Sequence, residues 1–192
     1  MLCDERGETQ TPLMECNPAA KEACRSGGCA NLCTLAADQR SNVGCEYWAV
    51  DLDNAVAAED LNAAAQQFAV VVSNPQPDLP AEVVIRQDDT APGAPGAPLE
   101  IARQTVPPYG LVVFRLGPRE VDGSPPGQYN TGSHTALTRA AYQITSDVPV
   151  VAYQFNPLEN VNVFSNDASL LKPVEALTNG AGSLTDAYVA LG

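Results

Sequence analysis

The sequence predicts a mainly-β protein: an antiparallel β-sandwich that follows a small N-terminal disulfide-rich unit. Three observations carry this prediction. Short stretches of β-branched and aromatic residues recur between residues 46 and 177. Sixteen prolines and fourteen glycines supply the many turns that such a fold needs. All six cysteines lie within the first 45 of the 192 residues, while 45% of the chain is apolar, which is enough for one core.

The cysteines indicate a disulfide framework over residues 1–45, because they are even in number and stand among Gly, Asn, Pro and Ser. The alternative, a zinc site, is disfavoured because the chain has no C-x-x-C pair and its only histidine, His134, is remote. Six cysteines can pair in many ways, and the sequence does not choose among them. A segment this short needs its bridges in place of a core; within it we expect one helical turn at 19–25. The six are Cys3, Cys16, Cys24, Cys29, Cys33 and Cys45.

The expected sandwich, residues 46–192, starts with an alternating strand at 46–51. Residues 68–73 form a continuous apolar run whose length and branching favour a buried strand over a helix. Pro149 stands where a strand tolerates proline, near its start. The remaining predicted strands are 81–87, 111–116, 141–145, 148–155 and 160–164, with one more at 186–191.

Two segments of this region do not read as strands. Residues 54–67 are rich in alanine and place apolar side chains at roughly helical spacing, which predicts either a helix or a loop insertion. Residues 90–98 repeat Ala, Pro and Gly, which is typical of a surface loop.

The charge and the cysteines limit the partners and the compartment. A net charge of −13 repels nucleic acid and anionic membranes, and no apolar run reaches membrane-spanning length. Disulfides form in oxidising compartments, so we expect an extracellular or cell-surface protein. The first residues show no secretory leader; we expect it to have been removed, or the chain to be a fragment.

One acidic stretch is a candidate metal site. Asp51, Asp53 and Asn54 follow the first strand, and their hard oxygen ligands suit calcium. The spacing is not that of an EF-hand, and the alternative is a solvated acidic loop. No other cofactor is indicated.

Further polar residues are candidates for binding or for bracing the fold. Ser165, Asn166 and Asp167 follow a predicted strand, as a ligand-facing loop or as turn-forming residues. Gln154 interrupts an apolar strand, and on the covered face it must be hydrogen-bonded. His134 lies in no hydrolase motif and is expected in a surface loop.

Three aromatic residues are candidate anchors for a partner, because aromatic side chains are favoured at interfaces. They are Tyr47, Trp48 and Tyr109. Trp48 follows the cysteine-rich unit directly, so we expect it to pack where that unit meets the sandwich.

Three segments, residues 42–51, 147–158 and 164–173, resemble the IgGFc-binding protein N-terminal domain family. The bacterial branch, found in secreted or surface proteins of myxobacteria and relatives, looks most similar. The resemblance implies an extracellular, non-catalytic module in adhesion or matrix contact. Family domains continue with more strands after Ser-Asn-Asp-Ala-Ser-Leu-Leu, so we expect residues 46–192 to be a domain truncated at its C-terminal end.

The sequence therefore predicts a secreted or cell-surface binding or adhesion module for a protein or glycan, and not an enzyme. Neighbouring domains of a larger surface protein are further candidate partners. The alternative is a structural or assembly subunit that pairs with other chains through an open sheet edge.

Overall fold

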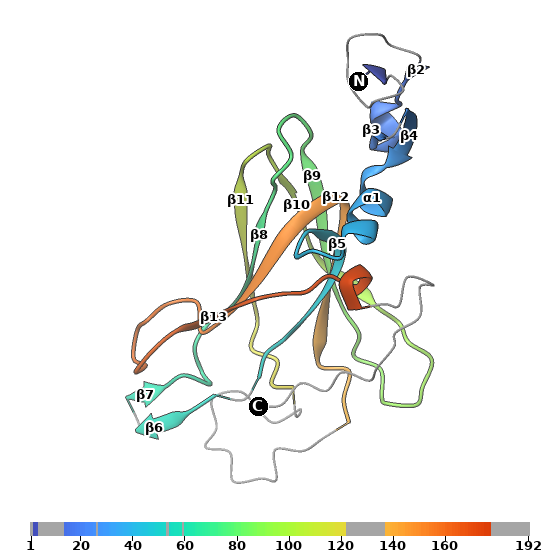
Figure 1. Cartoon of the computed structure of the whole chain (residues 1–192). Helices are drawn as coiled ribbons and strands as arrows, with labels where there is room; N and C mark the ends of the chain where they lie inside the picture. Colours follow the sequence, from blue (N-terminus) through green and yellow to red (C-terminus); the bar gives the residue numbers. More distant parts are fainter. Residues whose placement is uncertain are drawn as a thin grey trace.

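A computed structural model describes residues 2–3, 14–25, 27–52, 54–58, 60–121 and 137–177 (Figure 1). The fold is mainly β, and every named strand pairs antiparallel to its neighbours, which confirms the predicted fold class. No helix in the described ranges is long and apolar enough to cross a membrane.

The sandwich is built around one long strand, β12 (Ala141–Asn156), which belongs to both layers of a single seven-stranded sheet. The first half of β12 pairs with β5 (Gly44–Val50) and β9 (Ala81–Gln87), and β9 in turn pairs with β10 (Leu99–Val106). The second half pairs with β8 (Phe68–Ser73) and β13 (Asp167–Leu170), and β8 pairs with β11 (Leu111–Leu116). β10 and β11 follow each other in the chain without sharing a ladder, so the sheet is nearly closed (Figure 1).

β12 changes layers over residues 146–150. Ser146 is still paired with β9, and Val151 is already paired with β8. Pro149 lies in this stretch and has no N–H to give to a ladder, so the change of partner costs no hydrogen bond there. The two strands predicted at 141–145 and 148–155 are therefore one continuous strand, and Pro149 lies inside it rather than near its start.

The core lies between the two halves of β12 and their partner strands. Alternation sends one side of each strand inward, so that Phe68, Val70 and Val72 of β8 are completely buried. The rings of Phe68 and Tyr142 stack with centroids 5.8 Å apart. The other main core side chains are Tyr47, Ala49, Val83, Ile85, Phe114, Leu116, Ile144, Val150 and Ala152.

The N-terminal unit consists of short elements held by disulfides. Its strand pairs are β1 (Leu2–Cys3) with β2 (Met14–Glu15), and β3 (Glu22–Arg25) with β4 (Gly28–Asn31). Cys16 is bonded to Cys29 and Cys33 to Cys45, with S–S distances of 2.03 and 1.93 Å. Cys24 is also disulfide-bonded, and none of the described cysteines is free, which confirms the predicted framework.

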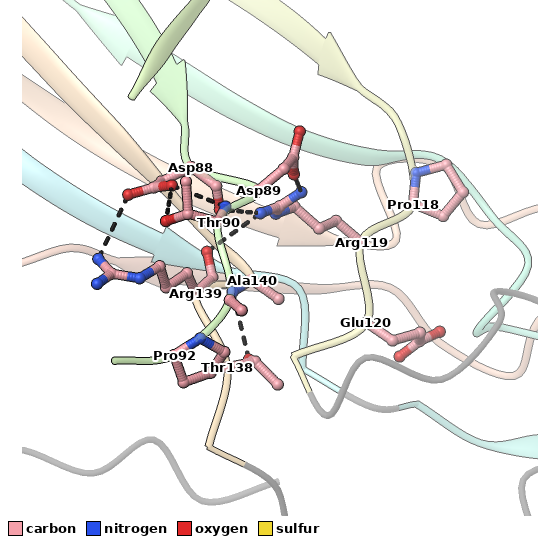
Figure 2. A pocket seen from close by; sticks show the side chains of 11 residues that line it. Asp88, Asp89, Thr90, Pro92, Pro118, Arg119, Glu120, Thr138, Arg139 and Ala140 are labelled. Carbon is pink, nitrogen blue, oxygen red and sulfur yellow. Dashed lines mark hydrogen bonds and ion pairs between the residues drawn. The ribbon is translucent and has the colours of Figure 1, made fainter. Parts of the chain in front are cut away.

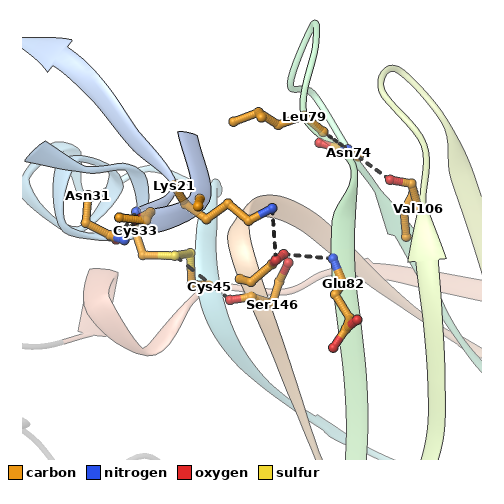
Figure 3. A network of polar contacts seen from close by, with 12 residues as sticks. Lys21, Asn31, Cys33, Cys45, Asn74, Leu79, Glu82, Val106 and Ser146 are labelled. Carbon is orange, nitrogen blue, oxygen red and sulfur yellow. Dashed lines mark hydrogen bonds and ion pairs between the residues drawn. A yellow bond between two sulfur atoms is a disulfide. The ribbon is translucent and has the colours of Figure 1, made fainter. Parts of the chain in front are cut away.

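Two helical elements of this unit differ from the predicted turn at 19–25. The 3-10 helix η1 covers only Pro18–Ala20, and the following residues form β3. The helix α1 (Leu32–Gln39) was not predicted. It starts at Asn31, whose Oδ1 accepts from the N–H groups of Cys33 and Thr34 at 2.9 and 3.4 Å (Figure 3).

The structure also tests the predictions for residues 54–67, 160–164 and 90–98. Among the described residues of 54–67 there is no helix, so the predicted helix is wrong; the segment contains β6 (Val56–Ala58) and β7 (Leu61–Asn62), which pair with each other and were not predicted. No strand forms at 160–164, and the next strand is β13. Residues 90–98 carry no helix or strand, as expected. The last described element is the 3-10 helix η2 (Val174–Leu177).

Candidate functional site

One hollow of the sandwich, of about 380 Å³, is lined by charged side chains (Figure 2). Three chain segments meet there: the start of the β9–β10 loop, the residues after β11 and the residues before β12. Its charged and polar lining residues are Asp88, Asp89, Thr90, Arg119, Glu120, Thr138 and Arg139.

The arginines of this hollow are already bound to its acids and to the backbone. Arg119 pairs with Asp89, and its Nη2 donates to the carbonyl oxygens of Asp88 and Arg139 at 2.8 and 3.1 Å (Figure 2). Arg139 pairs with Asp88 at 3.3 Å and donates to the carbonyl oxygen of Ala94 at 2.8 Å. Every outer guanidinium nitrogen is thus engaged, although the buried Nε of each arginine has no acceptor in the described ranges.

Hydrogen bonds within this hollow lower the pKa values of two of its carboxyl groups. Hydrogen bonds from Thr90 hold the pKa of Asp88 below its ordinary value, and the hydrogen bond from Arg119 does the same for Asp89. A ligand would have to displace these pairs. We therefore interpret the charged hollow as a fastening of three loops rather than as a binding site.

Another hollow, of about 180 Å³, has three amide side chains in its lining, and we call it the amide pocket. Its lower part is formed by two cross-strand pairs of β12 and β13, in which Gln154 faces Ser169 and Asn156 faces Asp167. Two residues that follow β5 complete the wall. The lining residues are Leu52, Asn54, Gln154, Asn156, Asp167 and Ser169.

Hydrogen bonds to the backbone fix the three amide side chains of this pocket. The Oε1 of Gln154 accepts from the N–H of Val50 at 3.1 Å, which ties the second half of β12 to β5. The Nδ2 of Asn156 donates to the carbonyl oxygen of Leu52 at 2.6 Å, and the Nδ2 of Asn54 donates to that of Asn156 at 3.0 Å. Gln154 is engaged at one end of its amide, and Asn54 and Asn156 at both ends, so the orientation of each amide is set before any ligand arrives.

Gln154 confirms the prediction made for it. Only 9% of the residue is exposed, and it braces the interior through its hydrogen bond to Val50. Val150 and Ala152, on the same face of β12, are fully buried as alternation requires.

The predicted calcium ligands are only partly described. Asp51 is buried, and its Oδ2 accepts from the N–H of Arg119 at 2.7 Å. The Oδ1 of Asn54 accepts from the N–H of Ala55 at 2.7 Å. Asp53 lies outside the described residues, and within the described ranges no group of three or more His, Cys, Asp or Glu side chains could hold a metal ion. The calcium site stays a prediction.

The predicted ligand-facing loop is split by the structure. Ser165 and Asn166 are exposed ahead of β13, whereas Asp167 begins that strand and lines the amide pocket. The fold therefore brings Asn54 of one candidate group and Asp167 of the other to the same pocket. The sequence did not predict that Ser169 and Asn156 line a pocket. The polar residues that interrupt the apolar run of β12 could have indicated the place of Asn156.

The aromatic candidates have three different surroundings. Tyr47 is fully buried, its hydroxyl donates to the carbonyl oxygen of Val150 at 2.5 Å, and burial raises its pKa far above the ordinary value. Trp48 is 50% exposed, and its packing where the cysteine-rich unit meets the sandwich stays a prediction. Tyr109 is 75% exposed in the turn between β10 and β11. His134 lies outside the described residues.

Comparison of the chain with protein-family models, with curated proteins and with solved structures gives no match. The resemblance to the IgGFc-binding protein N-terminal domain family stays a prediction.

Proposed function

We propose that this chain is an extracellular or cell-surface, non-catalytic binding module for a protein or glycan. The observation that carries the proposal is the amide pocket, where Asp167 and Ser169 are exposed and have hydrogen-bonding groups that the described part of the fold does not use. The disulfides indicate an oxidising compartment, which fits a role outside the cell.

The lining of the pocket supports binding rather than catalysis. Asp167 is its single ionisable side chain, so the lining offers no second acid or base to move a proton and no activated nucleophile. The groups that remain can position a ligand, which is what a binding module needs.

A binding screen tests this proposal. Three proteins are tested against arrays of glycans and of extracellular proteins: the parent chain, the variant Asp167→Ala, and Asp78→Ala as matched control. Asp78 is an exposed carboxylate in the loop between β8 and β9. We expect at least one array ligand to bind the parent chain and Asp78→Ala equally and Asp167→Ala about tenfold more weakly. Absence of any array ligand, or equal binding by all three proteins, would overturn the proposal.

A second candidate function, assembly with other copies or chains, is favoured by the free edge of β11. In the described ranges β11 pairs only with β8, and the side chains on its outer face include Leu111 and Val113, which are 58% and 37% exposed. Val113 continues an apolar row across the sheet through Val71 and Tyr153. An open edge beside an apolar face is suited to pairing with another strand.

Light scattering coupled to size-exclusion chromatography tests the assembly candidate. We expect an assembling chain to form a dimer or larger species that Val113→Lys converts to monomer, because a lysine on the edge opposes strand pairing. Glu82→Lys on β9 places the same side chain on an inner strand and is the control. A parent chain that stays monomeric at high concentration rules out assembly through this edge.

A further inference from the structure

We infer that the amide pocket binds a saccharide through a pair of neighbouring hydroxyl groups. This inference rests on the proposed function and names the ligand class of the same site. It depends on which hydrogen-bonding groups of the pocket are committed to the fold and which face the cavity.

The amide nitrogen of Gln154 is a donor that the fold leaves unused. The N–H of Val50 engages Oε1, and this fixes the amide so that Nε2 carries the two hydrogens on the other side. Nε2 has no acceptor within the described ranges, although nine-tenths of the residue is buried and it lines the pocket. Nε2 is not one of the buried side-chain atoms that lack a partner, so it is accessible from the pocket, where an acceptor on a ligand can replace water as its partner.

Asp167 and Ser169 supply complementary groups across the strand pair from Asn156 and Gln154. The carboxylate of Asp167 only accepts, and the hydroxyl of Ser169 both donates and accepts. Neither side chain has a partner in the described part of the chain. The pocket thus presents a fixed donor, a carboxylate acceptor and an adaptable hydroxyl on two neighbouring strands.

This set of groups disfavours the other classes of small ligand. No Lys, Arg or His lines the pocket, so a phosphate or carboxylate would face Asp167 without a counter-charge. A divalent cation would meet the N–H₂ of Gln154 and a single carboxylate, whereas calcium requires several oxygen ligands. Leu52 is the single apolar side chain of the lining, whereas pockets for apolar ligands are lined predominantly by hydrophobic and aromatic side chains.

Neighbouring sugar hydroxyls match what remains. Each hydroxyl accepts at its oxygen and donates through its hydrogen, so one oxygen can take a hydrogen from Gln154 while its neighbour donates to Asp167. The pocket volume of about 180 Å³ equals about six water molecules at ~30 Å³ each, which is room for one sugar ring and not for an extended peptide.

Titration of the ¹⁵N-labelled full chain with methyl glycosides tests the inference, with the side-chain N–H₂ signal of Gln154 as readout. The probes are the methyl glycosides of glucose, galactose and mannose at about 10 mM, since single-sugar affinities near 1 mM are expected. Glycerol, inorganic phosphate and calcium chloride are titrated in parallel. We expect the Gln154 N–H₂ signal to shift with at least one glycoside, and to shift less with glycerol, phosphate or calcium.

Gln154→Glu keeps the acceptor for Val50 but replaces the unused donor by a second carboxylate, so it should weaken glycoside binding about tenfold. Because this variant has no amide at position 154, the side-chain N–H₂ signals of Asn54 and Asn156, which also line the pocket, are followed in the parent chain and in all variants. Ser169→Ala changes an exposed residue, which keeps the test valid if Gln154→Glu fails to fold, and it should also weaken binding. Asp78→Ala should bind as the parent chain does. Shifts that are equal in the parent and both pocket variants, or produced by phosphate or calcium and not by any glycoside, overturn the inference.

The outcomes separate this inference from the proposed function. Array binding of a protein that depends on Asp167, without any glycoside binding, keeps the proposed function and removes the saccharide inference. Glycoside binding at the pocket supports both, and the absence of every array ligand together with the absence of glycoside binding removes both.

Discussion

Asp147 of β12 forms an ion pair with Lys21 of the N-terminal unit, with 3.2 Å between Oδ2 and Nζ (Figure 3). The other oxygen of the same carboxylate accepts from the N–H of Glu82 on β9 at 2.7 Å. Asp147 lies in the stretch where β12 changes layers. One side chain therefore ties the cysteine-rich unit to the sandwich and holds β12 to β9 where the strand ladder is interrupted.

Two substitutions of Asp147 should separate these roles. Asp147→Asn keeps an acceptor for Glu82 and removes the ion pair, so we expect a loss of less than about 1 kcal/mol in the free energy of unfolding, because both partners are partly exposed. Asp147→Ala removes both contacts and should cost about 1–2 kcal/mol more. Urea unfolding measures both values. Equal losses would show that the hydrogen bond to Glu82 contributes nothing.

The two described disulfides should contribute unequally to the stability of the sandwich. Cys33–Cys45 joins α1 to β5, whereas Cys16–Cys29 lies wholly within the N-terminal unit. We expect Cys33→Ala with Cys45→Ala to lower the stability of the sandwich by about 2–4 kcal/mol. Cys16→Ala with Cys29→Ala, the matched control, should leave the main unfolding transition nearly unchanged. Thermal unfolding of the two double variants measures the contribution of each disulfide. Identical unfolding transitions would contradict the larger contribution of Cys33–Cys45.

Much of the sandwich could be predicted because its inner strands bury apolar side chains on both faces. β8 and β9 therefore stand out as apolar runs. β10 did not, because it is an edge strand with mostly exposed residues and no inward pattern until Val106. α1 was missed because only Ala36 of its eight residues is buried, so it has almost no apolar face to reveal it.

The candidate site could be predicted only in pieces. The sequence singled out Asn54 and Asp167 separately, and their meeting depends on the pairing of β12 with β13 and on the loop after β5. Ser169 and Asn156 line the pocket because of the register between β12 and β13, and polar composition alone does not determine strand register.

Asn74 should be among the most sensitive polar positions of the fold. It is fully buried, and its Nδ2 donates to the carbonyl oxygens of Leu79 and Val106 at 2.8 and 3.0 Å (Figure 3). Its Oδ1 accepts from the N–H of Gln76 at 3.0 Å. Asn74→Ala leaves these backbone groups without partners, and we expect a loss of about 3 kcal/mol. Asn166→Ala, at an exposed asparagine, is the control and should stay within about 0.5 kcal/mol of the parent chain in urea unfolding.

Tyr142 should make the fold sensitive to alkaline pH. Its hydroxyl donates to the carbonyl oxygen of Gly117 at 2.7 Å, and burial raises its pKa from 10.0 to about 12. Because the folded-state pKa is the higher one, the stabilisation is complete below pH 10 and is lost as pH rises towards 12. Tyr47, whose pKa is raised as well, adds to the same decline and remains in the variant.

Tyr142→Phe should therefore reduce the fall in unfolding free energy between pH 10 and 12 by about 2 kcal/mol, while Tyr47 keeps part of the decline. Urea unfolding at several pH values measures the slope, and tyrosinate absorbance reports the titration itself. Tyr109→Phe, at a largely exposed tyrosine, should leave the slope unchanged. If Tyr142→Phe and Tyr109→Phe decline in parallel with the parent chain, the hydroxyl of Tyr142 titrates as freely as one in solvent, and its burial contributes no pH dependence.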